Sequence, residues 1–386
     1  MAKQLEPVRH RANELEPLGG PANSVAQIGA AANQAAANYS FIDYQQRRSA
    51  KTIRTQTAAL LLWVQYLDKI GAAVGLLPLA ATWAASFYTA QEHEALADYA
   101  AAQNVDLPHV WAAYFFQNSP AAWAGVTWGL VEGYVKWLLN QGYSIASVNN
   151  RLSAIKVYAR LATKSGAIPP ADHALIREVR GYGRTEGKRM NANRQQTRIG
   201  HKKEDAIVLT PEQASQLKNQ HPNTPQGIRD RLMICLFLDL GLRASEVAAL
   251  RVENLADTGC VVVYRQKTDT TDRLKLSADI TQALQDYRPY LRQSGILLRG
   301  SRKNSKLTDE VMSVRAIGSR IKAMGRDILG IWELSPHDLR HTWATQAAKN
   351  SNPFALRDAG GWTNMQTPSR YVERAEVANE GIELNY

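Results

Sequence analysis

Cysteine is scarce in this sequence, and long apolar runs are missing. Cys235 and Cys260 are the two cysteines among 386 residues, and both lie in apolar segments. Without a Cys-x-x-Cys motif or a His/Cys cluster, they exclude a disulfide framework and indicate no zinc site. We expect two buried free thiols in a reducing compartment. The apolar stretches, such as residues 58–64, are far shorter than the roughly 20 residues of a membrane-spanning helix.

Other features that mark common classes of protein are also missing. The N-terminus has basic residues but no hydrophobic signal region, so we expect a cytoplasmic protein with no membrane partner. The sequence shows no internal repeat and no glycine-rich nucleotide loop. No carboxylate cluster accompanies the basic residues, which argues against a metal-dependent nuclease. We therefore expect neither a metal nor a cofactor.

What the chain does have is a strong excess of positive charge. Its net charge is +11 and its isoelectric point is about 9.6. Such a balance suits a polyanionic partner, and nucleic acid is the commonest one, although a merely basic protein is the alternative. The length allows two domains, and a hydrophobic content of 45% is enough for a substantial core.

The first half of the chain has a helical pattern after an N-terminal arm. Residues 1–44 are rich in Ala, Asn, Gln and Gly, and we expect a flexible arm with one Ala-rich helix near residues 25–37. Apolar residues then recur at helical spacing over 45–183, with helices expected at 128–139 and 147–163. This pattern predicts an all-α helical bundle.

Basic residues gather on one helix face and in the segment after the bundle. The helix at 147–163 has an apolar side and a polar, basic side of the kind that lies on DNA. Residues 184–207 have few apolar anchors and form a basic interdomain linker, which can track a phosphate backbone. A solvated face and a solubilising loop are the alternatives. The expected DNA-contact residues are Arg151, Lys156, Arg160, Arg184, Lys188, Arg189, Arg194, Arg198, Lys202 and Lys203.

The second domain, residues 208–374, combines helices with a small antiparallel sheet. Thr210 is the N-cap of its first helix, and a buried helix over 228–240 follows. Residues 261–265 and 273–276 predict a β-hairpin in this mainly helical α+β domain. Three further helix starts combine a polar cap with proline, at Ser335-Pro336, Asn352-Pro353 and Thr367-Pro368.

The run from Ser335 to Thr342 carries a histidine and an arginine on one helix face. His337 and Arg340 are three residues apart, so they share that face. The helix start adds free N–H groups and the positive end of the helix dipole, which suit a phosphate. Asp338 points elsewhere and can cap the helix. A surface His-Arg pair is the alternative.

Five other side chains extend this site, and each of them is a weak sequence signal by itself. Arg243 follows the glycine that ends the apolar helix, and Glu246 can brace it; a helix-capping cation is the alternative. Lys267 in the hairpin can reach a bound backbone, although turn lysines are common. Trp362 can donate its indole N–H to a phosphate oxygen, and Tyr371 follows a Thr-Pro helix start. For these two aromatic residues, a core tryptophan and a structural tyrosine are the alternatives.

Together, the order and spacing of these residues resemble the tyrosine recombinase (phage integrase) family. The family's pattern is Arg, hairpin Lys, His-x-x-Arg, His or Trp, then Tyr, and the strings GLRASEVAAL, PHDLRHTWAT and GGWTN are similar to it. The resemblance covers 208–374 and extends more loosely to 148–155, which is similar to the end of the family's core-binding domain. Trp362 stands where histidine is more frequent, as in Cre-like members, and the region between residues 72 and 125 is longer than in minimal members. The resemblance assigns catalysis to Arg243, Lys267, His337, Arg340, Trp362 and Tyr371, with Glu246 behind them.

The resemblance implies DNA strand transfer that needs neither metal nor ATP. Tyr371 would attack the scissile phosphate and form a 3′-phosphotyrosyl link, and a free 5′-hydroxyl would leave. Arg243 and Arg340 would bind phosphate oxygens. Lys267 would protonate the leaving oxygen, and His337 would assist proton transfer at the tyrosine or hydrogen-bond the phosphate. Nearby cations would favour the phenolate.

The resemblance also implies partners. They are double-stranded DNA at specific recombination sites, and other copies of the chain, as a homotetramer in synapsis and a monomer in free solution. The protein would integrate, excise or resolve a mobile element or replicon at the nucleoid of a prokaryotic host. Residues 375–386 would form a C-terminal tail that docks on a neighbouring protomer through Ile382 and Leu384; a frayed tail is the alternative.

Two other functions remain open from the sequence. A type IB topoisomerase-like enzyme would use the same chemistry as a monomer that relaxes supercoils. A DNA-binding protein of the same fold without catalysis would act as an architectural factor. Relaxation without strand exchange would favour the first function, and full biological activity of a Tyr371→Phe variant would favour the second.

Overall fold

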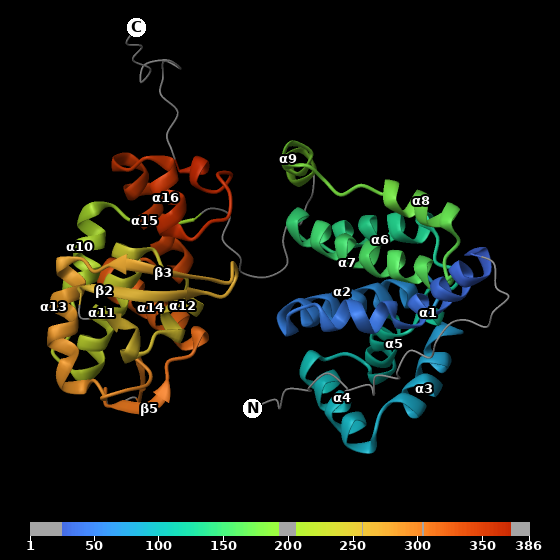
Figure 1. Cartoon of the computed structure of the whole chain (residues 1–386), viewed down its shortest axis with the longest axis horizontal. Coiled ribbons are helices and arrows are strands. Elements are labelled where there is room, and N and C mark those ends of the chain that lie inside the picture. Colours follow the sequence, from blue (N-terminus) through green and yellow to red (C-terminus); the bar gives the residue numbers. More distant parts are fainter. Residues whose placement is uncertain (1–24, 193–205, 257, 303–304, 372–386) are drawn as a thin grey trace, which may run out of the picture. The chain divides into compact units, whose positions relative to one another are not determined.

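The computed structural model describes residues 25–192, 206–256, 258–302 and 305–371. The chain divides into two compact units, Met1–His201 and Lys202–Tyr386 (Figure 1). The division falls inside the segment that the sequence predicts to be a linker. None of the helices in the described ranges combines the length and apolar composition needed to cross a membrane.

The described part of the first unit is entirely helical, in agreement with the predicted bundle (Figure 1). Helix α5 packs against α2, α3 and α4, and α7 packs against α2, α6 and α8. The elements are α1 (Val25–Gln46), α2 (Ala50–Lys69), α3 (Leu76–Phe87), α4 (Ala90–Gln103), α5 (Leu107–Asn118), η1 (Pro120–Trp123), α6 (Trp128–Asn140), α7 (Ile145–Lys164), α8 (Pro170–Glu178) and α9 (Arg184–Ala192).

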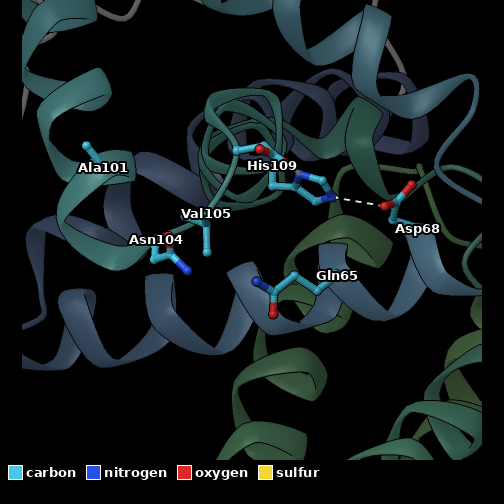
Figure 2. A pocket seen from close by; sticks show the side chains of 7 residues that line it. Gln65, Asp68, Ala101, Asn104, Val105 and His109 are labelled. Atoms are coloured by element: carbon cyan, nitrogen blue, oxygen red, sulfur yellow. Dashed lines mark hydrogen bonds and ion pairs between the residues drawn. The ribbon is translucent and has the colours of Figure 1, made fainter.

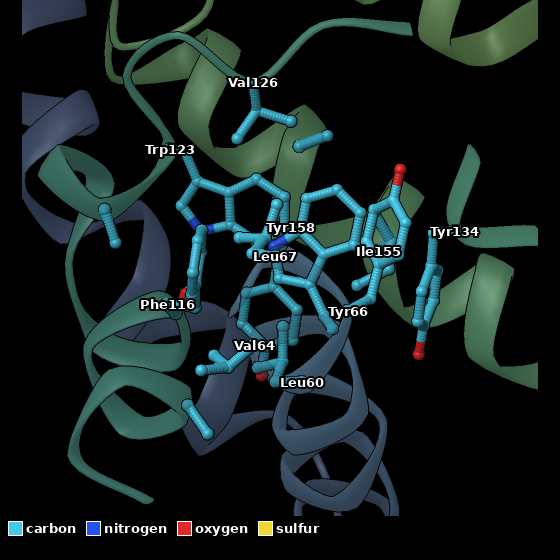
Figure 3. Close-up of a cluster of buried hydrophobic side chains, with 14 of the residues drawn as sticks. Leu60, Val64, Tyr66, Leu67, Phe116, Trp123, Val126, Tyr134, Ile155 and Tyr158 are labelled. Atoms are coloured by element: carbon cyan, nitrogen blue, oxygen red, sulfur yellow. The ribbon is translucent and has the colours of Figure 1, made fainter. Parts of the chain in front are cut away.

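Aromatic side chains fill the centre of this unit (Figure 3). The rings of Trp63 and Tyr134 meet edge to face with centroids 5.2 Å apart, and Trp123 stacks on Tyr158 at 6.2 Å. The indole N–H of Trp123 donates to the Phe116 carbonyl at 2.8 Å, so burial leaves this polar group paired. These contacts join α2, α5, α6 and α7 into one core.

Two of the sequence predictions for this unit hold, and two boundaries were wrong. Helices α6 and α7 match the helices predicted at 128–139 and 147–163. The predicted arm is helical from residue 25, and Phe41 and Tyr44 lie in the core, so the bundle begins before residue 45. The predicted linker begins as helix α9, which packs on the bundle, because Gly187 leaves room for the Ile145 side chain. Residues 1–24 and 193–205 lie outside the described residues.

A polar pocket of about 410 Å³ lies between α2 and the start of α5 (Figure 2). His109 bonds to Asp68 at 3.2 Å and lies 3.8 Å from Asp106, so this cluster ties α5 to α2. Among the described residues, no group of three or more His, Cys, Asp or Glu side chains is arranged to hold a metal ion. None of the predicted catalytic residues lines this pocket.

The second unit has a helical core with two small antiparallel sheets (Figure 1). Helix α11 packs against α13, α15 and α10. The elements are α10 (Pro211–Asn219), α11 (Pro225–Leu240), α12 (Ala244–Ala249), η2 (Val252–Asn254), β1 (Leu255–Ala256), β2 (Cys260–Arg265), β3 (Thr270–Lys275), α13 (Ala278–Tyr287), η3 (Arg288–Tyr290), β4 (Arg299–Ser301), β5 (Leu307–Val311), α14 (Val314–Leu329), α15 (Pro336–Asn350), α16 (Pro353–Gly360) and η4 (Pro368–Arg370).

The predicted hairpin is present, with a longer second strand than expected. Strand β3 begins at Thr270, so the turn after β2 is short, and a two-residue strand, β1, adds a third member in the order β1-β2-β3. Along β2, Val261, Val263 and Arg265 are buried in alternation, which is the period of a strand with one face on a core. Cys235 is buried as expected, but Cys260 on β2 is only partly so.

Most of the predicted helix starts are confirmed. Thr210 caps α10 in a reciprocal capping box with Gln213, and Asn352 caps α16 by accepting a hydrogen bond from a backbone N–H. The start at Thr367 gives a short 3-10 helix, η4, instead of the expected longer helix, and Tyr371 follows it directly. The predicted tail beyond residue 374 lies outside the described residues.

Gly241 ends α11 in a conformation and a space that suit glycine alone. Its φ is +59°, and a Cβ atom there would lie 2.1 Å from the Trp343 ring. We expect Gly241→Ala to lower the free energy of unfolding by about 2–4 kcal/mol, from backbone strain and overpacking together. Gly330 is the control for backbone strain without overpacking, because its φ is +69° and the space around it is open. Gly330→Ala should lower the free energy of unfolding by only about 1–2 kcal/mol. Equal urea midpoints for the two variants would contradict the packing part of this prediction.

Candidate active site

The start of α15 places His337 and Arg340 through a firmly held N-terminal turn. Ser335 caps the helix in a capping box with Asp338, whose Oδ2 accepts hydrogen bonds from the Ser335 N–H and hydroxyl at 2.7 and 2.6 Å. The other carboxylate oxygen of Asp338 accepts the Ile207 N–H at 2.9 Å. Asp338 is therefore a buried helix cap, as the sequence predicts. It also ties the start of the second unit to α15.

Arg340 is buried, and backbone carbonyls hold its guanidinium. Nη1 donates to the Gly241 carbonyl and Nη2 to the Gly360 carbonyl, the latter at 2.5 Å. The guanidinium also lies 4.8 Å from the centre of the Trp362 ring. Burial lowers the pKa of Arg340 to about 10, and the nearby Arg243 adds to this effect. The group stays cationic at neutral pH and keeps further N–H groups for an anion.

Arg243 is the N-cap residue of α12 and is braced by Glu246. Its Nη1 donates to Glu246 Oε1 at 2.6 Å, and its backbone N–H donates to Oε2 at 2.8 Å. Nη2 reaches the Gly361 carbonyl at 3.3 Å. With Arg340, His337 and residues of the two helix starts, Arg243 lines a pocket of about 280 Å³. The two predicted arginines and the predicted histidine therefore share one cavity.

Arg265 is a structural cation of this site that the sequence did not reveal. It is fully buried on β2 and donates to Glu246 at 2.9 Å, to Asp272 at 2.9 Å and to the Ala359 carbonyl at 2.8 Å. One carboxylate, Glu246, thus connects Arg243 with the β-hairpin. Gly361 allows this arrangement, because its φ is +59° and a Cβ there would lie 2.8 Å from Arg265 Nε.

Removing the Arg265 guanidinium should leave Glu246 buried without one of its partners. We expect Arg265→Met to lower the free energy of unfolding by about 3–5 kcal/mol, the usual cost of breaking a buried ion pair from one side. Arg273→Met is the matched control on β3, where the arginine is exposed, and it should change stability by less than about 0.5 kcal/mol. Chemical denaturation of both variants measures the difference, and a small cost for Arg265→Met would contradict the assigned role.

Tyr371 lies among aromatic rings and beside a second unassigned residue, His341. Its ring stacks on Trp362 at 5.9 Å, and its hydroxyl oxygen is 3.3 Å from His341 Nε2. Burial raises the pKa of Tyr371, while Arg340 and Arg370 act against this shift. The two cations therefore do not outweigh the effect of burial on the pKa of Tyr371.

Lys267 is the predicted catalytic residue that the structure does not bring to the others. It lies exposed in the turn between β2 and β3. Among the described residues, no hydrogen bond or ion pair joins it to Arg243, Arg340 or Tyr371. Its role as an acid stays a prediction.

The predicted DNA-contact residues divide into two groups. Two of them bond within the bundle: Arg151 donates to the Ser147 carbonyl and lies over the Tyr143 ring, and Lys156 donates to the Arg177 carbonyl at 2.8 Å. The polar face of α7 is thus partly covered by the chain that follows it. Arg160, Lys188 and Arg189 are exposed, and Arg184 begins α9. Arg194, Arg198, Lys202 and Lys203 lie outside the described residues.

Comparison with known sequences identifies the second domain. The sequence model described as the phage integrase family matches residues 208–377. The chain therefore contains a phage integrase family domain. The match begins at the predicted start of the second domain and includes every residue to which the resemblance assigned catalysis.

Sequence relatives agree with this match, and solved structures have a similar fold. Tyrosine recombinase XerC of Roseiflexus sp. (strain RS-1) is 24% identical over 299 residues, 74% of this chain and 86% of the relative. Tyrosine recombinase XerA of Thermococcus kodakarensis is 29% identical over 262 residues, 65% and 87% of the two chains. The site-specific recombinase XerH, solved in a post-cleavage complex with palindromic difH substrate, has a TM-score of 0.52 at 16% identity, covering 81% of this chain and 91% of that one. The Tn1549 transposon integrase with transposon right end DNA has a TM-score of 0.50 at 14% identity, covering 82% and 95%. These two structural likenesses show the fold.

Proposed function

We propose that the protein is a site-specific DNA recombinase that cleaves and rejoins strands through a 3′-phosphotyrosyl link at Tyr371. The family match of the second domain and the similarity to tyrosine recombinases support this reaction class. The observation that carries the assignment to residues is the arrangement at the start of α15. Arg340 and Arg243 line one pocket there, and the Tyr371 ring stacks on Trp362 while its hydroxyl contacts His341.

The geometry supports electrostatic stabilisation of a phosphate by the two arginines. Their guanidinium groups can donate to the oxygens that gain charge as the tyrosine attacks. Both cations are fixed before DNA arrives, Arg340 by two carbonyls and Arg243 by Glu246, so little reorganisation is needed in the transition state. Trp362 packs against both Arg340 and Tyr371 and keeps the attacking ring in place.

The leaving 5′-oxygen needs a proton, and Lys267 is the residue we assign to that step. Its place in an exposed hairpin turn allows it to reach a bound duplex. Because the phosphotyrosyl link keeps the energy of the broken bond, the 5′-hydroxyl of another strand can reverse the step without ATP. Strand exchange follows when that hydroxyl comes from a second duplex.

The net charge of +11 on the whole chain supports double-stranded DNA as the partner, because basic side chains bind its phosphate backbone. The exposed Arg160, Lys188 and Arg189 of the helical unit are the described residues that we assign to the phosphate backbone. Exchange between two sites requires four active chains, so we propose a homotetramer in synapsis, formed on DNA at a prokaryotic nucleoid. The protein would integrate, excise or resolve a mobile element or replicon.

The function is tested with a duplex selected by the protein itself. Random-sequence duplexes bound by the Tyr371→Phe variant are enriched and synthesised in pairs. In EDTA and without ATP, the wild-type protein should transfer a labelled strand from one duplex to the other. Relaxation of a supercoiled plasmid carrying that sequence, with no strand exchange, would instead indicate a topoisomerase-like enzyme. Binding without either reaction would indicate an inert DNA-binding protein.

A further inference from the structure

The hydroxyl of Tyr371 contacts a histidine outside the predicted catalytic set. Its oxygen lies 3.3 Å from Nε2 of His341, and the two rings meet at 62° with centroids 5.1 Å apart. His341 directly follows Arg340 on α15 and is one turn beyond His337, whose ring centre is 4.6 Å from its own. The nucleophile is thus in contact with an imidazole that the protein backbone has placed beside the phosphate-binding arginine.

The surroundings of His341 favour its neutral form. Burial lowers the pKa of His341, and His337 and Arg340 lower it further, while the Asp338 carboxylate acts in the opposite direction. A neutral imidazole has one ring nitrogen that can accept a proton. His341 is therefore a proton acceptor at neutral pH, in contact with the hydroxyl that must lose its proton.

The attacking hydroxyl needs such an acceptor. Burial raises the pKa of Tyr371, and the cations Arg340 and Arg370 only partly compensate. The hydroxyl consequently keeps its proton at neutral pH until it attacks. In the free protein, the nearby cations that were expected to favour the phenolate do not offset the effect of burial.

The two carboxylates built into this site are already occupied by donors. Glu246 accepts hydrogen bonds from Arg243 and Arg265, and Asp338 accepts them from the N–H and hydroxyl of Ser335. Both carboxylates are buried and serve to fix cations and a helix start. Within the described part of the chain, the His341 imidazole is the acceptor that contacts the tyrosine hydroxyl.

We infer that His341 is a further catalytic residue, whose Nε2 accepts the Tyr371 proton as the tyrosine oxygen attacks phosphorus. The inference rests on the function proposed above. The bond from the tyrosine oxygen to phosphorus forms while the bond from phosphorus to the 5′-oxygen breaks, and that oxygen leaves with a proton from Lys267. In the reverse step, His341 returns its proton to Tyr371. His337 is then assigned to hydrogen bonding of the phosphate.

The test measures single-turnover formation of the covalent complex on the selected duplex, nicked next to the cleavage site, as a function of pH in EDTA. The wild-type rate should rise with pH through an ionisation below 6.5, the ordinary histidine pKa, and then level off as His341 becomes neutral. His341→Gln should be about 100-fold slower and should lose that ionisation, so that its rate keeps rising with pH. His221→Gln is the matched control, since burial also lowers the pKa of His221 and none of its contacts reaches Tyr371.

Two further measurements separate a proton acceptor from a structural residue. A duplex with a 5′-bridging phosphorothiolate has a leaving group that needs no acid, so it should restore cleavage by Lys267→Ala but not by His341→Gln. Added imidazole should restore cleavage by His341→Ala, because it can fill the space and accept the proton. Duplex binding by all variants, measured by gel shift, should match that of the wild type.

The outcomes distinguish failure of this inference from failure of the proposed recombinase function. A wild-type rate and pH profile for His341→Gln, or its rescue by the phosphorothiolate, would overturn the role of His341 and leave the recombinase function intact. The absence of a covalent complex with the wild-type protein would overturn both.

Discussion

The Tyr371→Phe variant should form no covalent complex with DNA while binding the selected duplex as tightly as the wild type. The substitution removes only the hydroxyl, whose contact in the structure is His341. The ring keeps its stacking on Trp362, so the fold and the phosphate pocket should persist. With no nucleophile the phosphodiester cannot be attacked, and cleavage should fall below detection. The measurement is a denaturing gel of a nicked, labelled duplex incubated with protein in EDTA.

Tyr39→Phe is the matched control for this result. Tyr39 lies on α1 and is exposed, so loss of its hydroxyl should change neither binding nor cleavage. A covalent band with Tyr371→Phe at the wild-type rate would exclude Tyr371 as the nucleophile. A loss of duplex binding by Tyr371→Phe would instead indicate that the hydroxyl supports the fold.

Arg340→Lys should lower the rate of cleavage by about 1,000-fold. A lysine keeps the charge but lacks the planar set of N–H groups of a guanidinium. It therefore cannot donate to the carbonyls of Gly241 and Gly360 and to a phosphate at the same time. Loss of a single positioned donor in comparable sites costs roughly 100- to 1,000-fold in rate, and a guanidinium supplies more than one. The rate of covalent complex formation at saturating duplex concentration measures the effect.

Arg326→Lys on α14 is the control for this substitution. Arg326 is exposed and pairs with Asp327, so exchanging it should leave the cleavage rate unchanged. Arg340→Lys with more than a tenth of the wild-type rate would show that charge alone suffices, and that the two-carbonyl support of the guanidinium has no catalytic importance.

The parts of the site that follow from local sequence were predictable. The His-x-x-Arg spacing and the Ser-Pro helix start are sufficient to place His337 and Arg340 together on α15, because helix caps and helical periodicity act over a few residues. Gly241 marked the end of α11 for the same reason. The family resemblance then joined Arg243 and Tyr371 to them from distant parts of the chain.

Other parts depend on contacts between distant segments and were not predicted. The sequence places Arg265 in the hairpin without a partner, although its alternation with Val261 and Val263 indicates a buried position. His341 lies one turn after His337, and that spacing could have identified it. The polar face of α7 was expected to be open, but Lys156 bonds to the Arg177 carbonyl, a contact that helical periodicity does not reveal.

The boundaries of the first domain were wrong for a similar reason. Phe41 and Tyr44 belong to the core although the Ala-rich segment before them has no clear apolar stripe. Their packing depends on α7, more than a hundred residues later in the chain. The rings of Phe41 and Tyr44 both contact the ring of Tyr158 on that helix. Low amphipathicity therefore suggested an arm where tertiary packing forms a helix.

The most direct test of the account is to identify the residue that carries DNA. The wild-type covalent complex, trapped on the selected nicked duplex, is digested with protease and nuclease and analysed by mass spectrometry. The account predicts one modified peptide, with a nucleotide joined through its 3′-phosphate to the oxygen of Tyr371. A nucleotide on any other residue, or attached through a 5′-phosphate, would contradict it.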